Sequence, residues 1–473
     1  MAGRATFLGY SRALCPTCRA LVDGVRKARD GKVYLERFCP EHGAAESLIS
    51  SDAAWFTRSL TYTKPGSIPL GHATDVRRGC PEDCGLCPDH QQHSCLPIIE
   101  ITNHCNLDCP ICLVDNRHDY HMPIEDFGRI LDGLVAKEGS LETINLSGGE
   151  PTCHPELLRL LDVARERREI ARVSISSNGV RLASEPGLCE ELARRGVYVN
   201  LQLDAPDARA LAPLRGLGDQ LAVKERALGN LERAGVRTTL IATVARGASD
   251  RFVGDVVRLF FSKDFLLSLL FQPAVHLGRG ASFSPRDPRD RVTIPDVIDR
   301  IEAQSGGLLQ RADFLPLPCS HPSCFALTYL LKVGEELVPF PRFLDLGRYM
   351  ELLANRGTIR PDEGFERAIR DTIDEMWTSS AQVPDSNKIL ASLKRAIFLM
   401  YPPDRAIELA ERLRIGEGLV KTVFIHSFMD ADTFEVERVK RCCTHYALPD
   451  GRLMPACSYN VLYRARDPRW APR

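Results

Sequence analysis

Apolar and polar positions repeat with two different periods along the middle of the chain, between residues 96 and 280. Six short stretches rich in Ile, Val and Leu have the length and alternation of strands. The predicted strands are 98–102, 143–147, 172–177, 197–203, 237–244 and 267–272. Between them, apolar residues recur every three or four positions, which is typical of amphipathic helices. The predicted helices are 123–137, 155–168, 185–195, 221–234 and 250–261.

Six strand–helix units in succession predict a parallel sheet with helices packed outside it. Functional side chains are then expected in the loops that follow the strands, as in βα barrels. After Ala281 the alternation stops. Helices are predicted over 293–301 and 388–401, the chain from 325 to 423 is predicted to be mainly helical, and 423–430 is predicted to be a strand.

The 17 cysteines of the chain are grouped rather than scattered. The Met-Ala-Gly-Arg start is followed by no apolar segment before Cys15, so we expect no secretory signal and a reducing, cytoplasmic location. Cysteines in that setting indicate metal binding rather than disulfides. Cys153 and Cys189 stand alone and are expected to be buried free thiols, with a substrate-side role for Cys153 as the alternative.

One group, Cys105-Asn-Leu-Asp-Cys109-Pro-Ile-Cys112, directly follows the first predicted strand of the series. Three thiolates hold three corners of a [4Fe–4S] cluster, whereas full protein ligation takes four. One iron would then remain open to a cofactor or substrate. A structural zinc site and three unrelated buried thiols are the alternatives.

The loops after the next three strands carry further candidate residues. Ser147-Gly-Gly-Glu-Pro151 follows the second strand, and its glycines let backbone approach a ligand closely. Ser176 and Asn178 end the third strand in Ser174-Ile-Ser-Ser-Asn-Gly179. Asp204, with Gln202 as its alternative, ends the fourth, and a cap on the following helix is an equal interpretation of Asp204.

CxxxCxxC followed by GGEP resembles the radical S-adenosylmethionine (radical SAM) superfamily. The resemblance implies an α/β fold with a partial (β/α)₆ TIM-like barrel and cysteine-rich, metal-binding N- and C-terminal extensions. It implies that S-adenosylmethionine binds the open iron through its amino and carboxylate groups, and that reduction cleaves it to a 5′-deoxyadenosyl radical that abstracts hydrogen. Glu150 is the candidate partner of the amine. The cofactor-binding candidates are Gly148, Gly149, Glu150, Ser176, Asn178 and Asp204.

The N-terminal cysteines predict a mononuclear site. Cys15, Cys18 and Cys39 lie in CPxC and CPEHG turns and suit zinc or a single iron. The fourth ligand is His42 or a cysteine from elsewhere. A hairpin over 26–37, turning at Asp30-Gly31, is predicted between them. A reduced CxxC without metal is the alternative.

The remaining cysteines predict two auxiliary [4Fe–4S] clusters by ligand counting. Cys80, Cys84, Cys87 and Cys95 are assigned to the first, with zinc as its alternative. Cys319, Cys324, Cys443 and Cys457 are assigned to the second, with Cys442 as a substitute and separate free thiols as the alternative. The turn Pro449-Asp450-Gly451 is expected to bring Cys443 and Cys457 together.

Three further motifs narrow the resemblance. CPxC…CPEHG near the start, CPxxCGLCPxH before the core and PDGRxxPxC-x-YN near the end are similar to one radical SAM branch. That branch includes archaeal tetraether lipid synthases and dihydropterin methyltransferases. It implies a division into a cysteine-rich region (1–94), a radical SAM core (95–310) and a mainly helical region with cluster ligands (311–473).

Three functions follow as hypotheses. The first is hydrogen abstraction from unactivated sp3 C–H bonds of a lipid chain for C–C coupling, which predicts an apolar tunnel. The second is methylation of a pterin-like small molecule, which predicts a compact pocket with hydrogen-bonding groups. The third is an iron–sulfur or zinc scaffold without turnover.

Charge and hydropathy limit the partners. Lys and Arg number 61 and Asp and Glu 62, so no net field attracts nucleic acid. No apolar run reaches the ~20 residues that span a bilayer. The amphipathic helix over 388–401 leaves peripheral membrane contact open, although packing on the barrel is favoured. The resemblance implies a flavodoxin- or ferredoxin-like electron donor.

Overall fold

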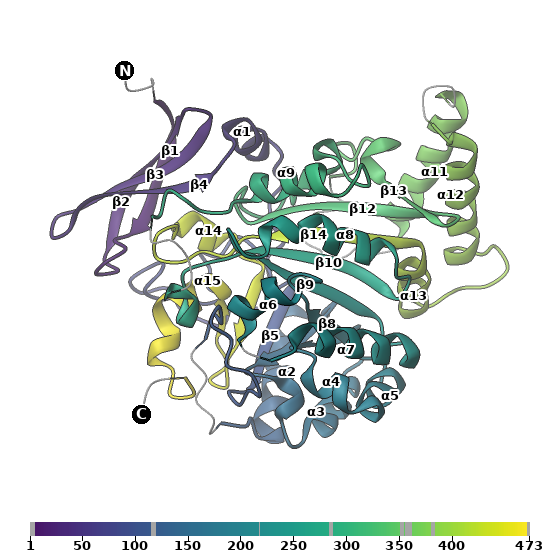
Figure 1. Ribbon diagram of the computed structural model, residues 1–473, viewed down its shortest axis with the longest axis horizontal. Helices are drawn as coiled ribbons and strands as arrows, with labels where there is room; N and C mark the ends of the chain where they lie inside the picture. Colours follow the sequence, from purple (N-terminus) through teal and green to yellow (C-terminus); the bar gives the residue numbers. More distant parts are fainter. Residues whose placement is uncertain are drawn as a thin grey trace.

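The computed structural model describes residues 5–114, 120–216, 218–282, 287–350, 354, 362–379 and 384–470. Within these residues, a 12-stranded mixed sheet forms the centre, and a separate four-stranded sheet lies at the N-terminal end (Figure 1). The central sheet runs β11-β12-β14-β10-β9-β8-β7-β6-β5-β15-β16, with β13 paired to β12.

The six predicted strands are confirmed as a parallel set. They are β5 (Leu96–Thr102), β6 (Ile144–Gly148), β7 (Val173–Ser177), β8 (Tyr198–Gln202), β9 (Thr238–Val244) and β10 (Leu266–Pro273). Their outward residues, such as Ile99 and Ile101 of β5, join the main hydrophobic core with the covering helices. The alternate residues, such as Glu100, face the opposite, concave side because successive side chains in a strand alternate.

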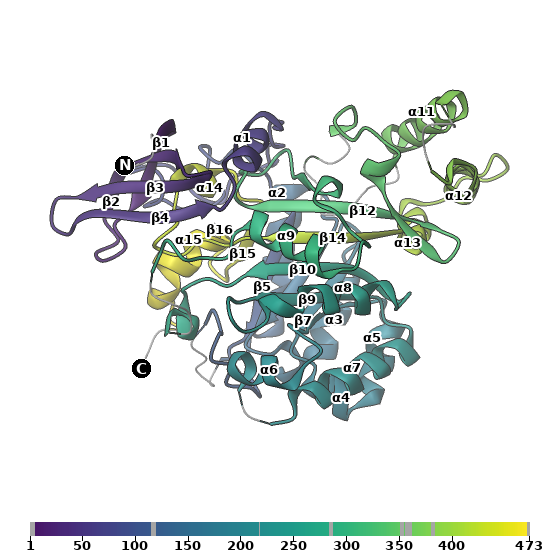
Figure 2. The same cartoon turned by 45° about the horizontal axis from the view of Figure 1, so that its top comes forward.

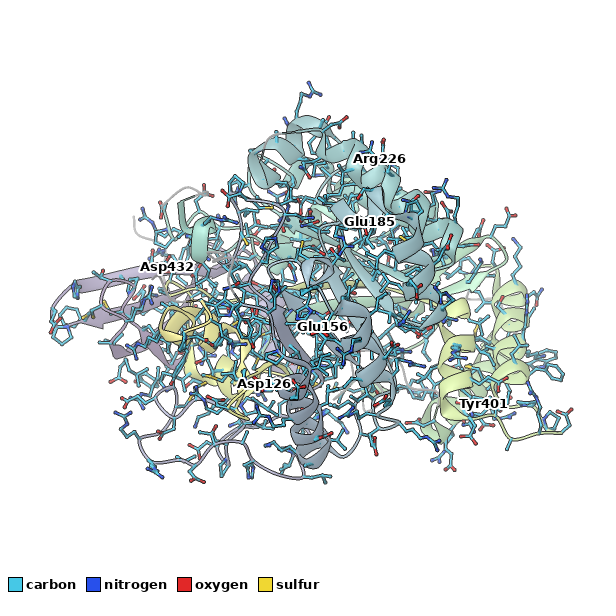
Figure 3. All side chains as sticks on the ribbon, turned by 90° about the horizontal axis from the view of Figure 1, so that it is seen from below. Asp126, Glu156, Glu185, Arg226, Tyr401 and Asp432 are labelled. Carbon is cyan, nitrogen blue, oxygen red and sulfur yellow. The ribbon has the colours of Figure 1, made fainter. Side chains whose placement is uncertain are left out.

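Helices cover the outer face of this parallel set, and the predicted ones are confirmed. They are α2 (Ile124–Glu138), α3 (Leu157–Arg165), α4 (Val180–Ser184), α5 (Pro186–Arg194), α6 (Ala208–Arg215), α7 (Gln220–Ala234) and α8 (Val253–Phe261). In Figure 3, Asp126, Glu156, Glu185 and Arg226 mark this layer. The α7 helix shows the local logic: the Asp219 carboxylate accepts from Ala222 N (3.0 Å) at its start, and Gly235 at φ 71° ends it.

The C-terminal part of the chain extends both edges of this set. Strand β14 (Val420–His426) runs parallel to β10, and β15 (Thr444–Ala447) runs parallel to β5. Beyond β14 lie β12 (Phe325–Val333), β11 (Leu315–Pro316) and β13 (Glu336–Pro339), and β16 (Leu453–Pro455) pairs antiparallel with β15. The region after 310 therefore shares the sheet of the core.

The expectation of a mainly helical chain over 325–423 is wrong for its first part, because β12 and β13 form a hairpin there. The run Phe325-Ala-Leu-Thr-Tyr-Leu-Leu is apolar on both sides, and periodicity does not separate a buried strand from a buried helix in such a run. The later part is helical as expected. It contains α11 (Glu363–Ser379), α12 (Ser386–Met400) and α13 (Leu409–Leu419), and α9 (Ile294–Gln304) precedes the hairpin. The strand expected over 423–430 spans Val420–His426 instead.

The N-terminal sheet is a separate antiparallel unit. It comprises β1 (Thr6–Leu14), β2 (Leu21–Arg29), β3 (Lys32–Cys39) and β4 (Gly43–Ser50), followed by α1 (Ala53–Thr61). The hairpin turn at Asp30-Gly31 is confirmed, with φ of 51° and 74°. The unit contacts the C-terminal segment through an Arg37–Asp432 ion pair (3.9 Å), and Asp432 is labelled at this junction in Figure 3.

Helices α11 and α12 project from the far end of the molecule (Figure 2). The apolar face of α12, including Ile389, Leu390 and Leu393, is buried in a second core that also contains residues of α11 and β12. The helix is therefore packed on the protein, but in this second core and not in the main core of the parallel strands, where packing on the barrel would place it. In the described part of the chain, every helix is too short or too polar to cross a membrane.

Candidate functional site

The three central cysteines lie in the loop that leaves the carboxyl end of β5. Cys109 is buried and Cys105 and Cys112 are partly exposed. The Leu107 amide donates to Cys105 Sγ (3.5 Å), and the Cys112 amide donates to Cys109 O (3.1 Å). Burial raises the pKa of Cys105 to about 12 and also raises the pKa of Cys112, since it disfavours the charged thiolate. Iron bound here would supply positive charge that favours the thiolate forms, and the three thiols of this loop would hold three corners of a cluster.

The two glycines of the Ser147–Pro151 motif hold this loop against its neighbour. A Cβ on Gly148, whose φ is 132°, would lie 2.0 Å from Thr102 O, and one on Gly149 would lie 2.3 Å from His104 O. The Gly149 amide donates to Thr102 O and the Glu150 amide to His104 O, both at 2.8 Å. The expected close approach is thus present, but it is to the backbone of the cysteine loop. Contact of these glycines with a ligand stays a prediction.

Glu150 is buried and joins the loops after β6 and β7. Its Oε1 accepts from the hydroxyls of Thr152 (2.7 Å) and Ser177 (2.9 Å), and its Oε2 accepts from the Asn178 amide (2.7 Å). Burial raises its pKa, and these donors offset part of the rise. A carboxylate has about four acceptor positions, two on each oxygen. Within the described residues, Oε2 accepts one hydrogen bond, so its second position can accept from an amine.

Asn178 and Ser176 lie at different depths. Asn178 Nδ2 donates to Asn106 Oδ1 (2.7 Å) and lies 3.8 Å from Cys105 Sγ, which places Asn178 at the cysteine loop. Ser176 lies lower, on the concave face, where it hydrogen-bonds Asn145 (3.0 Å). Asn145 Oδ1 also accepts from Ser174 and Asn200 at 3.0 Å. The concave face of β6 to β8 is therefore lined with amides and hydroxyls.

Asp204 forms a buried ion pair and does not cap a helix. Its two oxygens accept from Arg215 at 2.6 and 2.7 Å. Burial alone would raise the pKa of Asp204, but the Arg215 guanidinium holds it below its ordinary value. The cap interpretation is wrong, because Asp207 caps α6 by accepting from Arg209 N (2.8 Å) and Ala210 N (3.1 Å).

Sequence patterns missed two cations beside the cysteine loop. Arg215 of α6 interacts electrostatically with Cys109 as well as with Asp204. Lys224 of α7 is fully buried, donates from Nζ to Asn178 O, and has its pKa lowered by burial to about 8. Both lie in helices outside any motif, so no local signal in the sequence pointed to them.

The loop after β10 packs on the opposite side of the cysteine loop. The Gly280 amide donates to Cys112 O (3.1 Å), and a Cβ on Gly278 would lie 2.4 Å from Leu113 O. The cysteine loop is thus held between the loops after β6 and β10, which fixes the positions of its three thiols.

The N-terminal candidates converge as a four-ligand group. One ligand atom from each of Cys15, Cys18, Cys39 and His42 lies within 4.8 Å of the others. Cys39 Sγ is 3.5 Å from His42 Nδ1 and 3.9 Å from Cys18 Sγ. Three thiols and an imidazole suit a tetrahedral zinc site, and the structure brings His42, rather than another cysteine, to the fourth position.

The auxiliary candidates are grouped differently from the expectation. One cavity is lined by Cys324, Cys442, Cys443 and Cys457, together with Arg438 and His426. Cys319 is absent from that lining and instead interacts electrostatically with Cys95, whose thiol hydrogen-bonds Cys443. Cys80, Cys84 and Cys87 interact with one another, without Cys95 among their main partners. Residues far apart in sequence set these groups, so ligand counting did not find them.

Of the two lone cysteines, Cys189 is fully buried in the main core, as expected. Cys153 is only partly buried, so its expected burial is incomplete, and its pKa is raised mainly by that partial burial.

A three-cysteine loop after the first strand of a six-stranded parallel set is the site of a radical SAM protein, and sequence comparison agrees. Residues 99–260 match the radical SAM superfamily, and residues 7–51 match the HMPTM N-terminal zinc ribbon domain. The chain belongs to the radical SAM superfamily, and membership implies a [4Fe–4S] cluster and S-adenosylmethionine.

One relative spans nearly the whole chain. The 7,8-dihydro-6-hydroxymethylpterin dimethyltransferase of Methanocaldococcus jannaschii is 30% identical over 495 residues, covering 96% of this chain and 93% of that one. The GTP 3′,8-cyclase of Syntrophomonas wolfei is 29% identical over 167 residues, 34% of this chain and 50% of that one. Among solved structures, Streptococcus suis SuiB bound to S-adenosylmethionine has a TM-score of 0.37 at 16% identity, covering 45% of this chain and 47% of that one.

Proposed function

We propose that this protein is a radical SAM methyltransferase that acts on a dihydropterin. The full-length similarity to the Methanocaldococcus jannaschii dimethyltransferase carries the proposal. It reverses the order of the first two hypotheses, since no relative described above is a lipid synthase.

The concave face of the sheet independently favours a polar substrate. Asn145, Ser174, Ser176 and Asn200 form a hydrogen-bonded network there, and Gln202 lies on the same face of β8. Such groups are costly to bury against an alkyl chain but suit a heterocycle with ring nitrogens and a carbonyl. An apolar cavity does exist, but it lies between α11 and Phe340–Leu346 and is not lined by the three cysteines.

Each residue around the three-cysteine loop has a separate role in this proposal. Cys105, Cys109 and Cys112 hold the cluster, which with S-adenosylmethionine supplies radical chemistry when reduced. The free acceptor position on Glu150 Oε2 suits the cofactor amine, and Asn178 orients Cys105 from the side. Arg215, held by Asp204, places positive charge beside Cys109.

The other cysteines serve as metal sites in the same proposal. Cys15, Cys18, Cys39 and His42 hold zinc. Cys324, Cys442, Cys443 and Cys457 hold one auxiliary [4Fe–4S] cluster, and Cys80, Cys84 and Cys87 are ligands of another. A flavodoxin- or ferredoxin-like protein supplies electrons.

The experiment is anaerobic turnover of the iron-loaded protein. It is incubated with reductant, S-adenosylmethionine labelled in its methyl group, and 7,8-dihydro-6-hydroxymethylpterin. The proposal expects label in the pterin, analysed by mass spectrometry. Cys105→Ala should abolish the product, whereas Cys189→Ala, which removes a thiol in the helix layer, should retain it. Unlabelled pterin in the wild-type reaction would refute the proposal.

The auxiliary ligand set is tested by comparing Cys442→Ser with Cys319→Ser. The cavity lining predicts that Cys442→Ser loses about one cluster of iron per chain. Cys319→Ser should retain that cluster if Cys319 is not its ligand. The reverse pattern would restore the assignment made by ligand counting.

A further inference from the structure

Glu100 and Arg464 form a buried ion pair on the concave face, below the cysteine loop. Glu100 lies on β5, two residues before the carboxyl end of the strand, and its Oε1 accepts from Arg464 Nη2 at 2.7 Å. Arg464 lies close enough to Cys112 to act electrostatically on that thiol. The pair therefore occupies the part of the fold where a βα barrel places its substrate.

Each member of the pair has a polar atom left over. Within the described residues, Glu100 Oε2 and Arg464 Nη1 are buried and have no hydrogen-bond partner. The side chains are 4% and 8% exposed. A buried charged group without its hydrogen bonds lowers the stability of the folded protein. Replacing a buried ion pair with apolar side chains is often neutral or stabilising. The pair therefore has one acceptor and one donor available to a ligand or to a water molecule.

The surroundings hold Arg464 in one position. Its guanidinium lies 4.6 Å from the ring of Tyr459, 4.7 Å from Trp470 and 5.0 Å from Tyr446. Arg464 Nε also donates to Asn460 Oδ1 at 2.8 Å. The chain reaches Arg464 through a π-helical turn, Tyr459–Tyr463, and such turns occur frequently at functional sites. Arg464 is thus held with one donor unused, and its partner Glu100 has one carboxylate oxygen unused.

We propose that Glu100 and Arg464 recognise the 2-amino-4-oxopyrimidine ring of the pterin substrate. Glu100 Oε2 accepts from the N3–H and 2-amino group, and Arg464 Nη1 donates to the 4-oxo group. The ring offers donors directly beside an acceptor, which matches the unused acceptor and donor of the pair. The inference rests on the proposed function and assigns the residues that select its substrate.

The test is equilibrium dialysis of the iron-loaded protein, without reductant, against two ligands. One is 7,8-dihydro-6-hydroxymethylpterin, and the other is the matching 2,4-dioxo compound, in which oxygen replaces the 2-amino group. A site built to pair an N–H rejects an analogue that lacks it. The wild type should bind the pterin at least tenfold more tightly than the dioxo compound, and Glu100→Gln should lose at least tenfold in pterin affinity and most of that preference.

Asp313→Asn is the matched control. Asp313 is another buried carboxylate paired with an arginine, Arg342 (2.7 Å), but it lies between α9 and β11, away from the cysteine loop. The Asp313→Asn variant should bind the pterin and the dioxo compound with wild-type affinity. Iron content and cleavage of S-adenosylmethionine without pterin should match the wild type in Glu100→Gln, which a merely structural role would not predict.

The outcomes separate the two proposals. If the wild type binds neither compound, the dihydropterin function fails and this site fails with it. If the wild type binds the pterin but does not prefer it to the dioxo compound, or if Glu100→Gln binds it as tightly as the wild type, the assignment of Glu100 and Arg464 is overturned while the function stands. In this second outcome, ordered water and not the pterin is the partner of Glu100 and Arg464.

Discussion

Gly149 sets the position of the cysteine loop through the absence of a side chain. Gly149→Ala would place a Cβ 2.3 Å from His104 O, a backbone atom that the cysteine loop cannot move cheaply. Overpacking of this kind costs about 1–3 kcal/mol or more. We expect a lower melting temperature and reduced iron per chain after reconstitution.

Gly187→Ala is the control for that change. Gly187 lies in α5, and a Cβ there meets no atom within 4 Å. Alanine in a helix should stabilise the protein by roughly 0.5–1 kcal/mol and leave the iron content unchanged. Equal iron content in both alanine variants would show that the Gly149 contact does not matter.

Lys421 gives the stability of the protein a pH dependence. Its side chain is buried between β14 and α8, where Nζ donates to Lys263 O (2.6 Å), and burial lowers its pKa to about 8. Because the unfolded lysine titrates near 10.4, the unfolded state binds more protons between these values, and wild-type stability should rise from pH 8 towards pH 10 through this residue.

Lys421→Met removes the contribution of this lysine to the pH dependence of stability. We expect it to stabilise the protein at pH 7 by about 1–3 kcal/mol, with a smaller gain at pH 10, measured by denaturant unfolding at both values. Lys263→Met, which breaks an exposed pair with Glu232, should change stability by less than about 1 kcal/mol. A gain for Lys421→Met that grows with pH would contradict the assigned direction.

At the residue scale, the sequence points to site candidates where they directly follow strands. Cys105, Glu150 and Asn178 were found because each follows a strand within a few residues, and the structure brings them together. Arg215 and Lys224 were not found, since a long basic side chain in a helix has many ordinary uses on a surface. Only the packing of α6 and α7 against the cysteine loop distinguishes them.

At the scale of elements, the N-terminal sheet supports the segment that carries Cys442 and Cys443. Arg26 of β2 pairs with Glu435 (3.2 Å), and Ser11 of β1 donates to the same carboxylate (3.0 Å). Cys18→Ser should release the zinc that we propose for the N-terminal site, and it should loosen this sheet. We expect faster hydrogen exchange over 430–443 and loss of iron from the cavity, with the cluster at Cys105 retained.

Metal analysis and cleavage of S-adenosylmethionine separate these two iron sites. Cys189→Ala removes a buried cysteine that lies near Leu182 in the helix layer, so it should leave zinc and iron unchanged. Full iron content and unchanged exchange in a zinc-free Cys18→Ser protein would show that the two regions are independent.

The strands were predictable where their neighbours are adjacent in sequence. Strands β5 to β10 alternate with helices along the sequence. The pairing of β14 with β10 and of β15 with β5 joins segments more than a hundred residues apart, and nothing in their own sequences specifies a partner. The pairing of β15 with β5 also brings Cys95 close to Cys443, and the pairing of β12 with β14 adds β12 to the sheet.

At the scale of the whole molecule, the α11–α12 pair projects from one end. The sequence of α12 left peripheral membrane contact open as a hypothesis. Ile389, Leu393 and Ile397 of α12 are 2%, 3% and 8% exposed, so its apolar stripe is used inside the protein. Trp377 and Phe398 remain exposed. We expect the protein to stay in the supernatant when sedimented with anionic liposomes. Cosedimentation that Trp377→Ser and Phe398→Ser abolish would contradict this.

The most direct measurement of the central claim is the rate at which the iron-loaded, reduced enzyme forms 5′-deoxyadenosine with different substrates. A polar concave face beneath three cysteines predicts that 7,8-dihydro-6-hydroxymethylpterin accelerates this rate and becomes methylated, whereas a phospholipid does neither. Acceleration by the lipid alone would contradict the account.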